Sequence, residues 1–315
     1  MCCETMATSD ARAHSRHATA LRMFSGGVLA PTILGLAACA TLQVDAPSGT
    51  PSVNSAQGAT PSKTAEPQAT TTVAVIGDFG SGNDDERAVA DLVASLAPTA
   101  VVTVGDNVYS DAGYDPLVGD YYRSFVDAQT FFPATGNHDY SQGIENFDAY
   151  FSYLDGQRTY RVSRGPIDFF VLDGDAAMSA DTRDVTMEWL RTQTEQSTAP
   201  FKVVAVHYPP YSSGDQHGSS PDMQWAFAGM GIDLVLAGHD HIYERIETGG
   251  VTYVVNGSGG KDLYACSSPR VAGSIVCDDT HFGALLLSAS EAQLTARMMA
   301  TDGSVIDEFV VPTRR

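Results

Sequence analysis

The stretch Thr72-Val73-Ala74-Val75-Ile76-Gly77-Asp78-Phe79-Gly80 decides the fold of this chain. An unbroken apolar run rich in β-branched residues is typical of a parallel strand that is buried on both faces. The residue just past the carboxyl end of such a strand lies where open α/β sheets bind their ligands. Asp78 is therefore a candidate functional residue, placed by the strand before it.

Four later motifs repeat this arrangement, each directly after an apolar run. They are Gly105-Asp106-Asn107-Val108-Tyr109, Gly136-Asn137-His138-Asp139, Val203-Val204-Ala205-Val206-His207 and Gly238-His239-Asp240-His241. Together with Asp78, the metal-capable side chains of these motifs are Asp106, Tyr109, Asn137, His207, His239 and His241. Carboxylates, an amide, a phenol and three imidazoles that converge on one edge form the ligand set of a two-metal hydrolytic site.

The segments between the motifs predict β-α units. Acidic residues at Asp84, Asp85 and Glu86 begin an amphipathic helix, at the end where the helix dipole favours negative charge. A second helix contains Met187, Trp189 and Leu190. Strands are predicted at residues 72–76, 101–104, 131–135, 169–172, 203–206 and 233–237, and then at 251–256, 284–288, 294–299 and 305–310. Parallel units followed by a strand-rich tail indicate an α/β fold of two sheets packed face to face with helices outside.

Residues 1–38 predict a secretory signal peptide. A basic start precedes an apolar stretch at residues 28–38, which is too short to span a bilayer. The stretch ends in Leu36-Ala37-Ala38-Cys39, which resembles the bacterial lipobox, whose cysteine becomes the lipid-bearing N-terminus. Ordinary cleavage between the small residues around Cys39 is the alternative. We expect an exported protein, lipid-anchored through Cys39 at the bacterial cell surface or periplasmic face, or otherwise secreted.

Residues 39–70 predict a flexible linker. They are rich in alanine, serine, threonine, proline, glycine and glutamine, and such a segment buries too little apolar surface to offset the entropy of ordering. Residues 71–315 are enough for a single α/β domain, which we expect to be monomeric. Cys266 and Cys277 fall in this domain. In an oxidising compartment they would form a disulfide, and in a reducing one both would be thiols.

The formal net charge of −20 argues against a nucleic-acid partner. An acidic surface without a basic cluster repels the phosphate backbone at long range. A small phosphorylated molecule is a different case, because two multivalent cations at the site would outweigh a distant surface charge that salt screens. We therefore expect small phosphorylated substrates.

The five motifs together resemble those of the purple acid phosphatases, a branch of the calcineurin-like metallophosphoesterase superfamily. The resemblance covers residues 72–288, and five motifs in order are far more specific than any one of them. Tyr109 favours the purple branch, since most superfamily members lack a tyrosine three residues after the second aspartate. The resemblance implies a four-layer α-β-β-α sandwich of two mixed sheets, here in a small, single-domain, bacterial lipoprotein-like member.

The resemblance also implies a role for each motif residue. Fe(III) would be bound by Asp78, Asp106, Tyr109 and His241. A divalent metal (Zn, Fe or Mn) would be bound by Asp106, Asn137, His207 and His239, so that Asp106 bridges. Hard anionic oxygens suit a trivalent ion, and imidazoles suit the divalent one. His138 and His217 would be catalytic, contacting phosphate or protonating the leaving oxygen, although Ser219 replaces the family's usual proline after His217-Gly218.

The expected activity is that of an acid phosphatase: hydrolysis of phosphate monoesters by a metal-bound hydroxide at a dinuclear Fe(III)–M(II) site. Because a trivalent ion lowers the pKa of bound water steeply, we expect an acidic pH optimum. Three alternatives stay open. The first is a phosphodiesterase of the same superfamily that acts on nucleotides or lipid head groups. The second is a surface lipoprotein whose metal site serves binding alone. The third is redox chemistry at iron, which would be a secondary activity.

Four further acidic and basic residues near the motifs have predicted structural roles. We expect Asp139 and Asp240 to orient ligand imidazoles rather than to bind metal. Glu244 and Arg245 are expected to form an ion pair or to clamp a loop. The glycine-rich segment 256–260 is expected to be a turn near the site.

Overall fold

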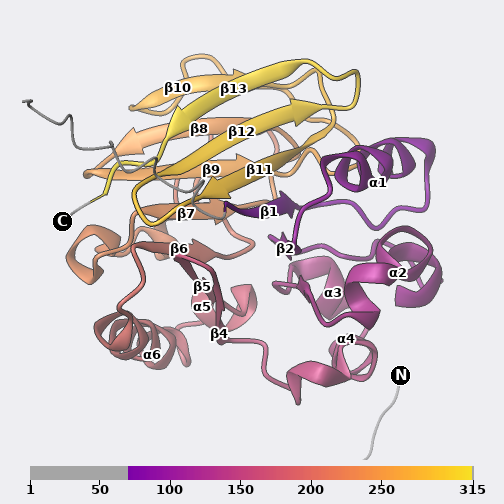
Figure 1. Cartoon of the computed structure of the whole chain (residues 1–315), viewed down its shortest axis with the longest axis horizontal. Coiled ribbons are helices and arrows are strands. Elements are labelled where there is room, and N and C mark those ends of the chain that lie inside the picture. Colours follow the sequence, from indigo (N-terminus) through magenta and orange to yellow (C-terminus); the bar gives the residue numbers. More distant parts are fainter. Residues whose placement is uncertain (1–69, 314–315) are drawn as a thin grey trace, which may run out of the picture. The chain divides into compact units, whose positions relative to one another are not determined.

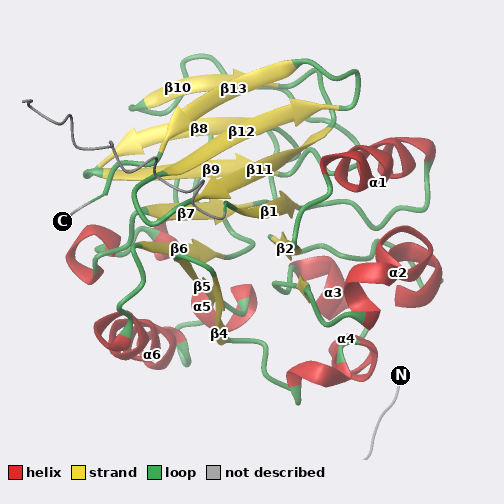
Figure 2. Cartoon of the chain, in the orientation of Figure 1, coloured by secondary structure: helices red, strands yellow, loops and turns green. Residues whose placement is uncertain are grey.

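A computed structural model of the protein describes residues 70–313, and the predicted signal peptide and linker lie outside these residues except for Thr70. The described part contains two β-sheets (Figures 1 and 2). The six-stranded sheet has the spatial order β13 (Val305–Val310), β12 (Leu294–Ala300), β11 (Gly283–Ala289), β1 (Thr71–Ile76), β2 (Ala100–Thr103) and β3 (Phe131–Phe132). Within this sheet β1, β2 and β3 are parallel to one another, and the remaining pairings are antiparallel.

The seven-stranded sheet is also mixed. Its spatial order is β10 (Ser274–Asp278), β8 (Tyr243–Thr248), β9 (Val251–Asn256), β7 (Leu234–Ala237), β6 (Phe201–Ala205), β5 (Ile167–Val171) and β4 (Tyr160–Arg164). The four central strands β9, β7, β6 and β5 are parallel, and the outer strands pair antiparallel. The parallel strands of both sheets therefore send their carboxyl ends into loops that carry the motifs.

Helices cover the outer face of each sheet (Figure 1). Those of the six-stranded sheet come from residues 84–154: α1 (Asp84–Leu96), η1 (Asp115–Gly119), α2 (Asp120–Asp127), α3 (Asn137–Ser141), α4 (Ile144–Tyr150) and η2 (Ser152–Leu154). Those of the seven-stranded sheet are α5 (Gly174–Met178), α6 (Arg183–Gln196), η3 (Pro221–Met223) and η4 (Phe227–Met230). The layers run helix, sheet, sheet, helix, as the fold class predicted.

The alternation of side chains along each strand explains the layers. On β1, Val73 and Val75 face the second sheet, whereas Ala74 and Ile76 face the helices. All four are fully buried, because both sides of the strand are covered. Burying an aliphatic side chain contributes roughly 1.5–3 kcal/mol, so an unbroken apolar run is stable only in such a sandwiched position.

The helix after β1 begins where the sequence indicated. The side chain of Asn83 caps α1 by accepting a hydrogen bond from the backbone N–H of Glu86 at 2.8 Å. Val89 and Val93 lie on the buried face, one turn apart. Glu86, expected to favour the helix dipole, is in addition fully buried and accepts hydrogen bonds from the backbone of Ser81 and Gly82 at 3.0 and 2.6 Å.

Some predicted strands differ from those observed. The stretch at residues 131–135 forms only the two-residue strand β3, because Pro133, the next residue, has no N–H to donate to a sheet. Three strands were not predicted: β4, β8 and β10. Each carries polar or charged residues, and β4 and β10 lie at the two edges of their sheet. The other predicted strands agree with the structure to within about two residues.

Cysteine pairing and membrane-spanning helices can also be compared with the sequence. Cys266 and Cys277 form the expected disulfide, with their Cα atoms 6.3 Å apart. Among residues 70–313, no helix combines the length and the apolar character that crossing a bilayer needs.

Glu244 and Arg245 do not pair with each other, because neighbouring residues on a strand point to opposite faces. Glu244 clamps the loop at Ser213, accepting from its backbone N–H and hydroxyl at 2.6 Å each. Arg245 pairs with Asp307 at 2.7 Å and with Glu247 at 2.6 Å.

Candidate metal centre

The predicted donor residues follow five parallel strands of the two sheets. Oxygen donors come from the six-stranded sheet: Asp78 after β1, Asp106 and Tyr109 after β2, and Asn137 after β3, where it begins α3. Imidazoles come from the seven-stranded sheet: His207 after β6, and His239 and His241 after β7. The centre therefore lies where the carboxyl ends of both sets of strands meet.

One group of donors consists of Asp78, Tyr109 and His241. The Tyr109 hydroxyl lies 3.1 Å from Oδ1 of Asp78 and 3.0 Å from Nε2 of His241. Nε2 of His241 is 3.5 Å from the same Asp78 oxygen. Asp78 and His241 are buried. A carboxylate, a phenol and an imidazole thus face one point.

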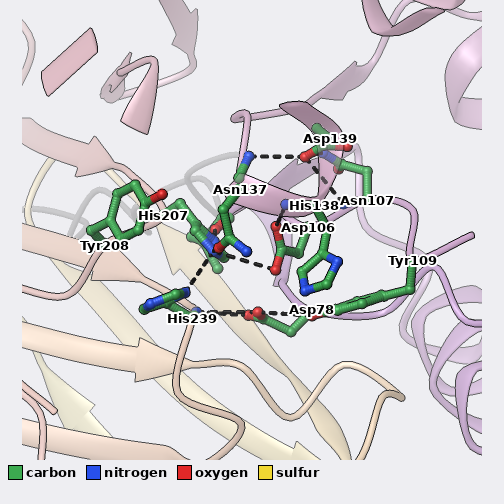
Figure 3. A network of polar contacts seen from close by, with 12 residues as sticks. Asp78, Asp106, Asn107, Tyr109, Asn137, His138, Asp139, His207, Tyr208 and His239 are labelled. Atoms are coloured by element: carbon green, nitrogen blue, oxygen red, sulfur yellow. Dashed lines mark hydrogen bonds and ion pairs between the residues drawn. The ribbon is translucent and has the colours of Figure 1, made fainter. Parts of the chain in front are cut away.

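A second group surrounds Nε2 of His207. This nitrogen lies 3.0 Å from Oδ1 of Asn137, 3.1 Å from Nδ1 of His239 and 3.4 Å from Oδ2 of Asp106 (Figure 3). Asp106, His207 and His239 place three donor atoms within 4.8 Å of one another, close enough to hold one metal ion. The structure therefore brings all seven predicted donors into two adjoining groups.

Left-handed backbone and glycines make this convergence sterically feasible. Asp78, Asp106 and His239 have φ angles of 56°, 51° and 71°, a region that aspartate and histidine enter more readily than most residues. A Cβ atom at Gly136 would lie 2.2 Å from Oδ1 of Asp106, and one at Gly105 would lie 2.6 Å from the His207 ring. The motif glycines are needed because any side chain there would displace a donor.

The donors perturb one another's protonation strongly. Burial, followed by the negative charge of Asp78, holds the pKa of Tyr109 well above its usual range. Burial, followed by the positive charge of His207, lowers the pKa of His239 to about 2. Burial opposes ionisation of Asp106, but the His207 imidazole beside it lowers the pKa of that carboxyl below its usual range. A phenol among carboxylates and an imidazole kept neutral suit a nearby cation, which would stabilise both.

Backbone carbonyls orient two of the ligand imidazoles. Nδ1–H of His207 donates to the carbonyl of Val104 at 2.9 Å, and Nδ1–H of His241 donates to the carbonyl of Asp262 at 2.8 Å. Because a carbonyl only accepts, a proton is on Nδ1 in both rings, and in the neutral form of each ring the lone pair of Nε2 faces the donor groups.

Asp139 does not orient an imidazole, contrary to the sequence-based expectation. Its carboxylate accepts from Gly136 N–H at 2.8 Å, from the Asn107 side chain at 3.0 Å and from the Tyr114 hydroxyl at 2.8 Å (Figure 3). Burial, followed by the charge of Asp106, raises its pKa to about 7. Asp139 therefore ties together the loops after β2 and β3, which carry three of the predicted donors.

Asp240 likewise binds a loop rather than a ligand ring, which corrects the second expectation. Its carboxylate accepts from the Ser212 hydroxyl at 2.6 Å and from the backbone N–H groups of His217 and Gly218 at 3.1 and 2.9 Å. The residue between His239 and His241 thus holds the segment that bears His217.

The two predicted catalytic histidines lie on opposite sides of the donors. The His138 ring packs against Tyr109 with centroids 4.3 Å apart, and its backbone N–H donates to Asp106 at 2.8 Å. The His217 ring stacks on His239 with centroids 3.9 Å apart and planes at 24°. His281, which the sequence left outside the motifs, pairs with Asp278 at 3.0 Å.

Three residues beside the centre were not predicted. Tyr208 packs edge-on against His207 and His239, and its hydroxyl donates to Asp175 at 2.8 Å (Figure 3). Tyr264 stacks on His241, and the ammonium group of Lys261 lies 5.6 Å from the centre of the Tyr109 ring. Tyr208 directly follows a motif residue, which was a usable signal. Tyr264 and Lys261 lie in no motif.

Comparison with known proteins agrees with this geometry. Residues 71–243 match the family model of the calcineurin-like phosphoesterases. The chain belongs to this family. It is 28% identical to purple acid phosphatase 5 of Arabidopsis thaliana over 193 residues, which cover 56% of this chain and 45% of that protein. It is 26% identical to Fe(3+)-Zn(2+) purple acid phosphatase 12 of the same plant over 216 residues, 59% of this chain and 46% of that protein.

The chain spans about half the length of these two relatives. Among solved structures, purple acid phosphatase PPD1 from yellow lupin (Lupinus luteus) seeds superimposes with a TM-score of 0.64 at 19% identity. The superposition covers 78% of this chain and 54% of the lupin chain. At this identity the likeness concerns the fold, which is the mixed α/β sandwich that the sequence predicted.

Proposed function

We propose that this protein is an acid phosphatase that hydrolyses phosphate monoesters at a site for Fe(III) and a divalent metal. The observation that carries the proposal is the position of Tyr109, whose hydroxyl lies within hydrogen-bond distance of both Asp78 and His241. A half-buried phenol between a carboxylate and an imidazole is a donor set for a hard trivalent ion. The purple acid phosphatases among the relatives support the same choice.

Each donor group fits one of the two ions. Asp78, Tyr109 and His241 would hold Fe(III), and Asn137, His207 and His239 would hold the divalent ion, with Asp106 shared. The relative named as an Fe(3+)-Zn(2+) enzyme supports zinc as one candidate for the second ion, beside Fe(II) and Mn(II). When bound, the two ions would acidify a water molecule and neutralise charge on the phosphate.

The chain's own residues supply orientation and proton transfer. His138 packs on Tyr109 and is positioned to donate to a phosphate oxygen near Asp106. His217 lies next to His239, and the backbone N–H groups of His217 and Gly218 donate to Asp240. In this position His217 would give its proton to the leaving oxygen. Tyr208 packs against His207 and His239 and limits the approach of bulk water on that side.

We propose an acidic pH optimum. A trivalent ion acidifies a coordinated water more than zinc, which alone brings its pKa to about 7. A rate profile that peaks above pH 8 would contradict ferric iron in the Asp78 group.

Metal analysis combined with a visible spectrum tests the proposal. The wild-type protein should contain Fe(III) and a divalent ion, which is zinc, manganese or a second iron. It should also show a broad absorption band from phenolate bound to Fe(III). The Tyr109→Phe variant should lose that band while keeping its fold by circular dichroism. Iron-containing protein without such a band, or protein without iron, would remove the purple-phosphatase assignment.

Substrate preference separates the monoesterase from its nearest alternative. Turnover of an aryl phosphate monoester should exceed turnover of the matching aryl diester, because a monoester presents three unesterified oxygens and up to two negative charges to the two ions, whereas a diester presents two such oxygens and one charge. A preference for the diester would instead assign the protein to the phosphodiesterases of the family. Metal uptake without hydrolysis of either ester would favour a binding protein.

We further propose that the catalytic domain works outside the cytoplasm as a monomer. The Cys266–Cys277 disulfide supports an oxidising compartment. Anchoring through a lipid on Cys39 is tested by mass spectrometry of the membrane fraction, compared with a Cys39→Ala variant. The acidic charge of the chain supports small phosphorylated substrates over nucleic acids.

A further inference from the structure

The segment from Lys261 to Cys266, here called the 261–266 loop, touches the candidate metal centre without belonging to any motif. It follows the turn after β9, in which Gly259 N–H donates to the carbonyl of Gly77 at 3.0 Å. The next contact is from Lys261 N–H to the carbonyl of Asp78 at 3.1 Å. The loop therefore begins bound to the backbone of the first motif.

Two residues of this loop fix the orientation of the His241 ring. The carbonyl of Asp262 accepts from Nδ1–H at 2.8 Å. The Tyr264 ring stacks on the imidazole with centroids 4.0 Å apart and planes at 12°. The backbone N–H of Tyr264 also donates to the carbonyl of His241 at 3.0 Å. One contact sets the direction of Nε2, and the other restricts rotation of the ring out of its plane.

The same tyrosine reaches the segment that carries His217. Its ring contacts the His217 imidazole with centroids 5.7 Å apart and planes at 63°. The adjoining backbone is held to that segment as well, since Asp215 N–H donates to Ala265 O at 3.0 Å and Ser267 N–H donates to Ser213 O at 2.7 Å. Tyr264 thus lies between one predicted iron ligand and the predicted proton donor.

The disulfide fastens the far end of the 261–266 loop. Cys266 is bonded to Cys277 on β10, and its backbone N–H donates to Asp279 at 2.9 Å. Cys266 also forms an isolated β-bridge with Gly214, next to the His217 segment. The loop is therefore anchored at both ends, with Tyr264 between the anchors.

We infer that Tyr264 is a positioning residue for this centre: its ring holds the His241 imidazole in the plane for metal binding and sets the place of His217. The inference rests on the proposed function for the identity of the metal and the reaction. Residues that orient a ligand imidazole typically cost 10–100-fold in metal affinity or activity when they are removed. The Cys266–Cys277 disulfide contributes by keeping the loop in place.

The test compares Tyr264→Leu with Tyr264→Phe in the full-length, metal-loaded protein. Tyr264→Leu removes the flat ring and should weaken iron affinity about tenfold, measured by competition with a chelator. Tyr264→Phe keeps the ring and should restore affinity to within about twofold. Tyr121→Leu is the matched control, because Tyr121 is a half-buried tyrosine that packs against Arg87 on α1.

A second measurement addresses His217. Tyr264→Leu should lower turnover of an alkyl phosphate several-fold more than turnover of a nitrophenyl phosphate, because only the poor leaving group needs a proton from His217. Tyr121→Leu should leave this ratio unchanged. A tyrosine that merely stabilised the fold would lower the melting temperature without changing either the affinity or the ratio. That result overturns the inference.

A variant with both cysteines replaced covers the case in which Tyr264→Leu does not fold. Cys266→Ser with Cys277→Ser loosens the loop but keeps the tyrosine, and should shift iron affinity and the leaving-group ratio in the same direction by a smaller factor. Unchanged values in a folded double variant overturn the inference. Wild-type protein that takes up no iron defeats the proposed function separately. The Tyr264 comparison is then made with Zn(II) affinity, and equal affinities overturn it.

Discussion

Every predicted donor from the six-stranded sheet presents oxygen, whereas every predicted donor from the seven-stranded sheet presents imidazole nitrogen. The oxygen side consists of Asp78, Asp106, Tyr109 and Asn137, and the imidazole side of His207, His239 and His241. In the proposed arrangement each ion takes donors from both sides, so neither side alone completes a site. The comparison teaches that the centre belongs to the seam between the sheets rather than to either one.

The two sides also differ in charge. The oxygen side gathers two carboxylates around a half-buried phenol, and this crowding of negative groups helps to hold the pKa of Tyr109 high. The imidazole side keeps His239 neutral through burial and the positive charge of protonated His207. Cations between the sides would relieve the repulsion on the first and, by displacing the His207 proton, would bind the imidazole lone pairs of the second.

The largest expected effect comes from removing the metal ions that would lie between the two sheets. Removing metal with a chelator should destabilise the protein by about 4 kcal/mol when the metal is present at 1,000 times its dissociation constant. For a domain of this size the melting temperature should fall by roughly 10 °C, measured by calorimetry. The Asp106→Asn variant should show a much smaller shift on chelation. Equal shifts in both proteins would show that Asp106 does not bind metal.

A second polar link between the sheets provides a comparison with no metal involved. Asp307 on β13 accepts from Arg245 and from the Tyr243 hydroxyl, both on β8, at 2.7 and 2.9 Å. Asp307→Ala leaves a largely buried guanidinium short of one partner and should cost about 3 kcal/mol in unfolding free energy. Denaturant titration measures this. Glu308→Ala, at the exposed neighbouring position, should change stability by less than about 0.5 kcal/mol.

Asp106 separates the roles of charge and shape on the oxygen side. Asp106→Asn keeps the size of the side chain but removes the charge, and should lower kcat/KM on an aryl phosphate by more than about 100-fold, the upper cost of losing an outer contact. Asp168→Asn is the matched control, since Asp168 is equally buried but bonds to Arg161, Ser163 and Ser197. The control should lose stability while turnover by the folded protein is retained.

Glu86 provides a control for the comparison. It is a buried carboxyl beside the six-stranded sheet, and its hydrogen bonds come from Ser81 and Gly82 rather than from a predicted metal donor. Burial raises its pKa to about 8 from 4.5, against the lowering effect of hydrogen bonds from Gly82 and Ser81. Between pH 4.5 and 8 the folded protein therefore keeps a proton on Glu86 that the unfolded chain has already released. The free energy of unfolding consequently falls as the pH rises through this window. Wild type should lose about 1–2 kcal/mol from pH 5 to pH 8 relative to Glu86→Gln. Parallel stability curves for the two proteins would contradict the shifted pKa.

The sequence predicted every strand that is buried on both faces, and the three strands that it missed carry polar or charged residues. β1, β6 and β7 contain apolar runs because helices and a second sheet cover them. β8 reads Tyr-Glu-Arg-Ile-Glu-Thr, and its charged residues find partners only in the folded protein. Nothing in the local sequence indicates that Asp307, some 60 residues later, lies beside Arg245.

The convergence of the predicted donors was predictable for the same reason, since each of these residues follows a recognisable strand. The supporting residues were less predictable. Asp139 and Asp240 stand beside donors in sequence, yet they accept hydrogen bonds from backbone N–H groups of other loops, at Asn107 and His217. The contact of Tyr264 with His241 depends on the path of a loop 23 positions downstream. Contacts of this kind follow from tertiary packing, which strand patterns do not encode.

The left-handed backbone at Asp78, Asp106 and His239 governs which replacements a saturation-mutagenesis library would tolerate. Asparagine and glycine adopt such a conformation at little cost, whereas β-branched residues do so poorly. In most library members at these positions, the loss of the predicted metal ligand would therefore be accompanied by strain in the backbone, and the two effects could not be separated. Survivors enriched for folding alone should be asparagine and glycine, and ranking them by catalysis would isolate the chemistry of the missing side chain.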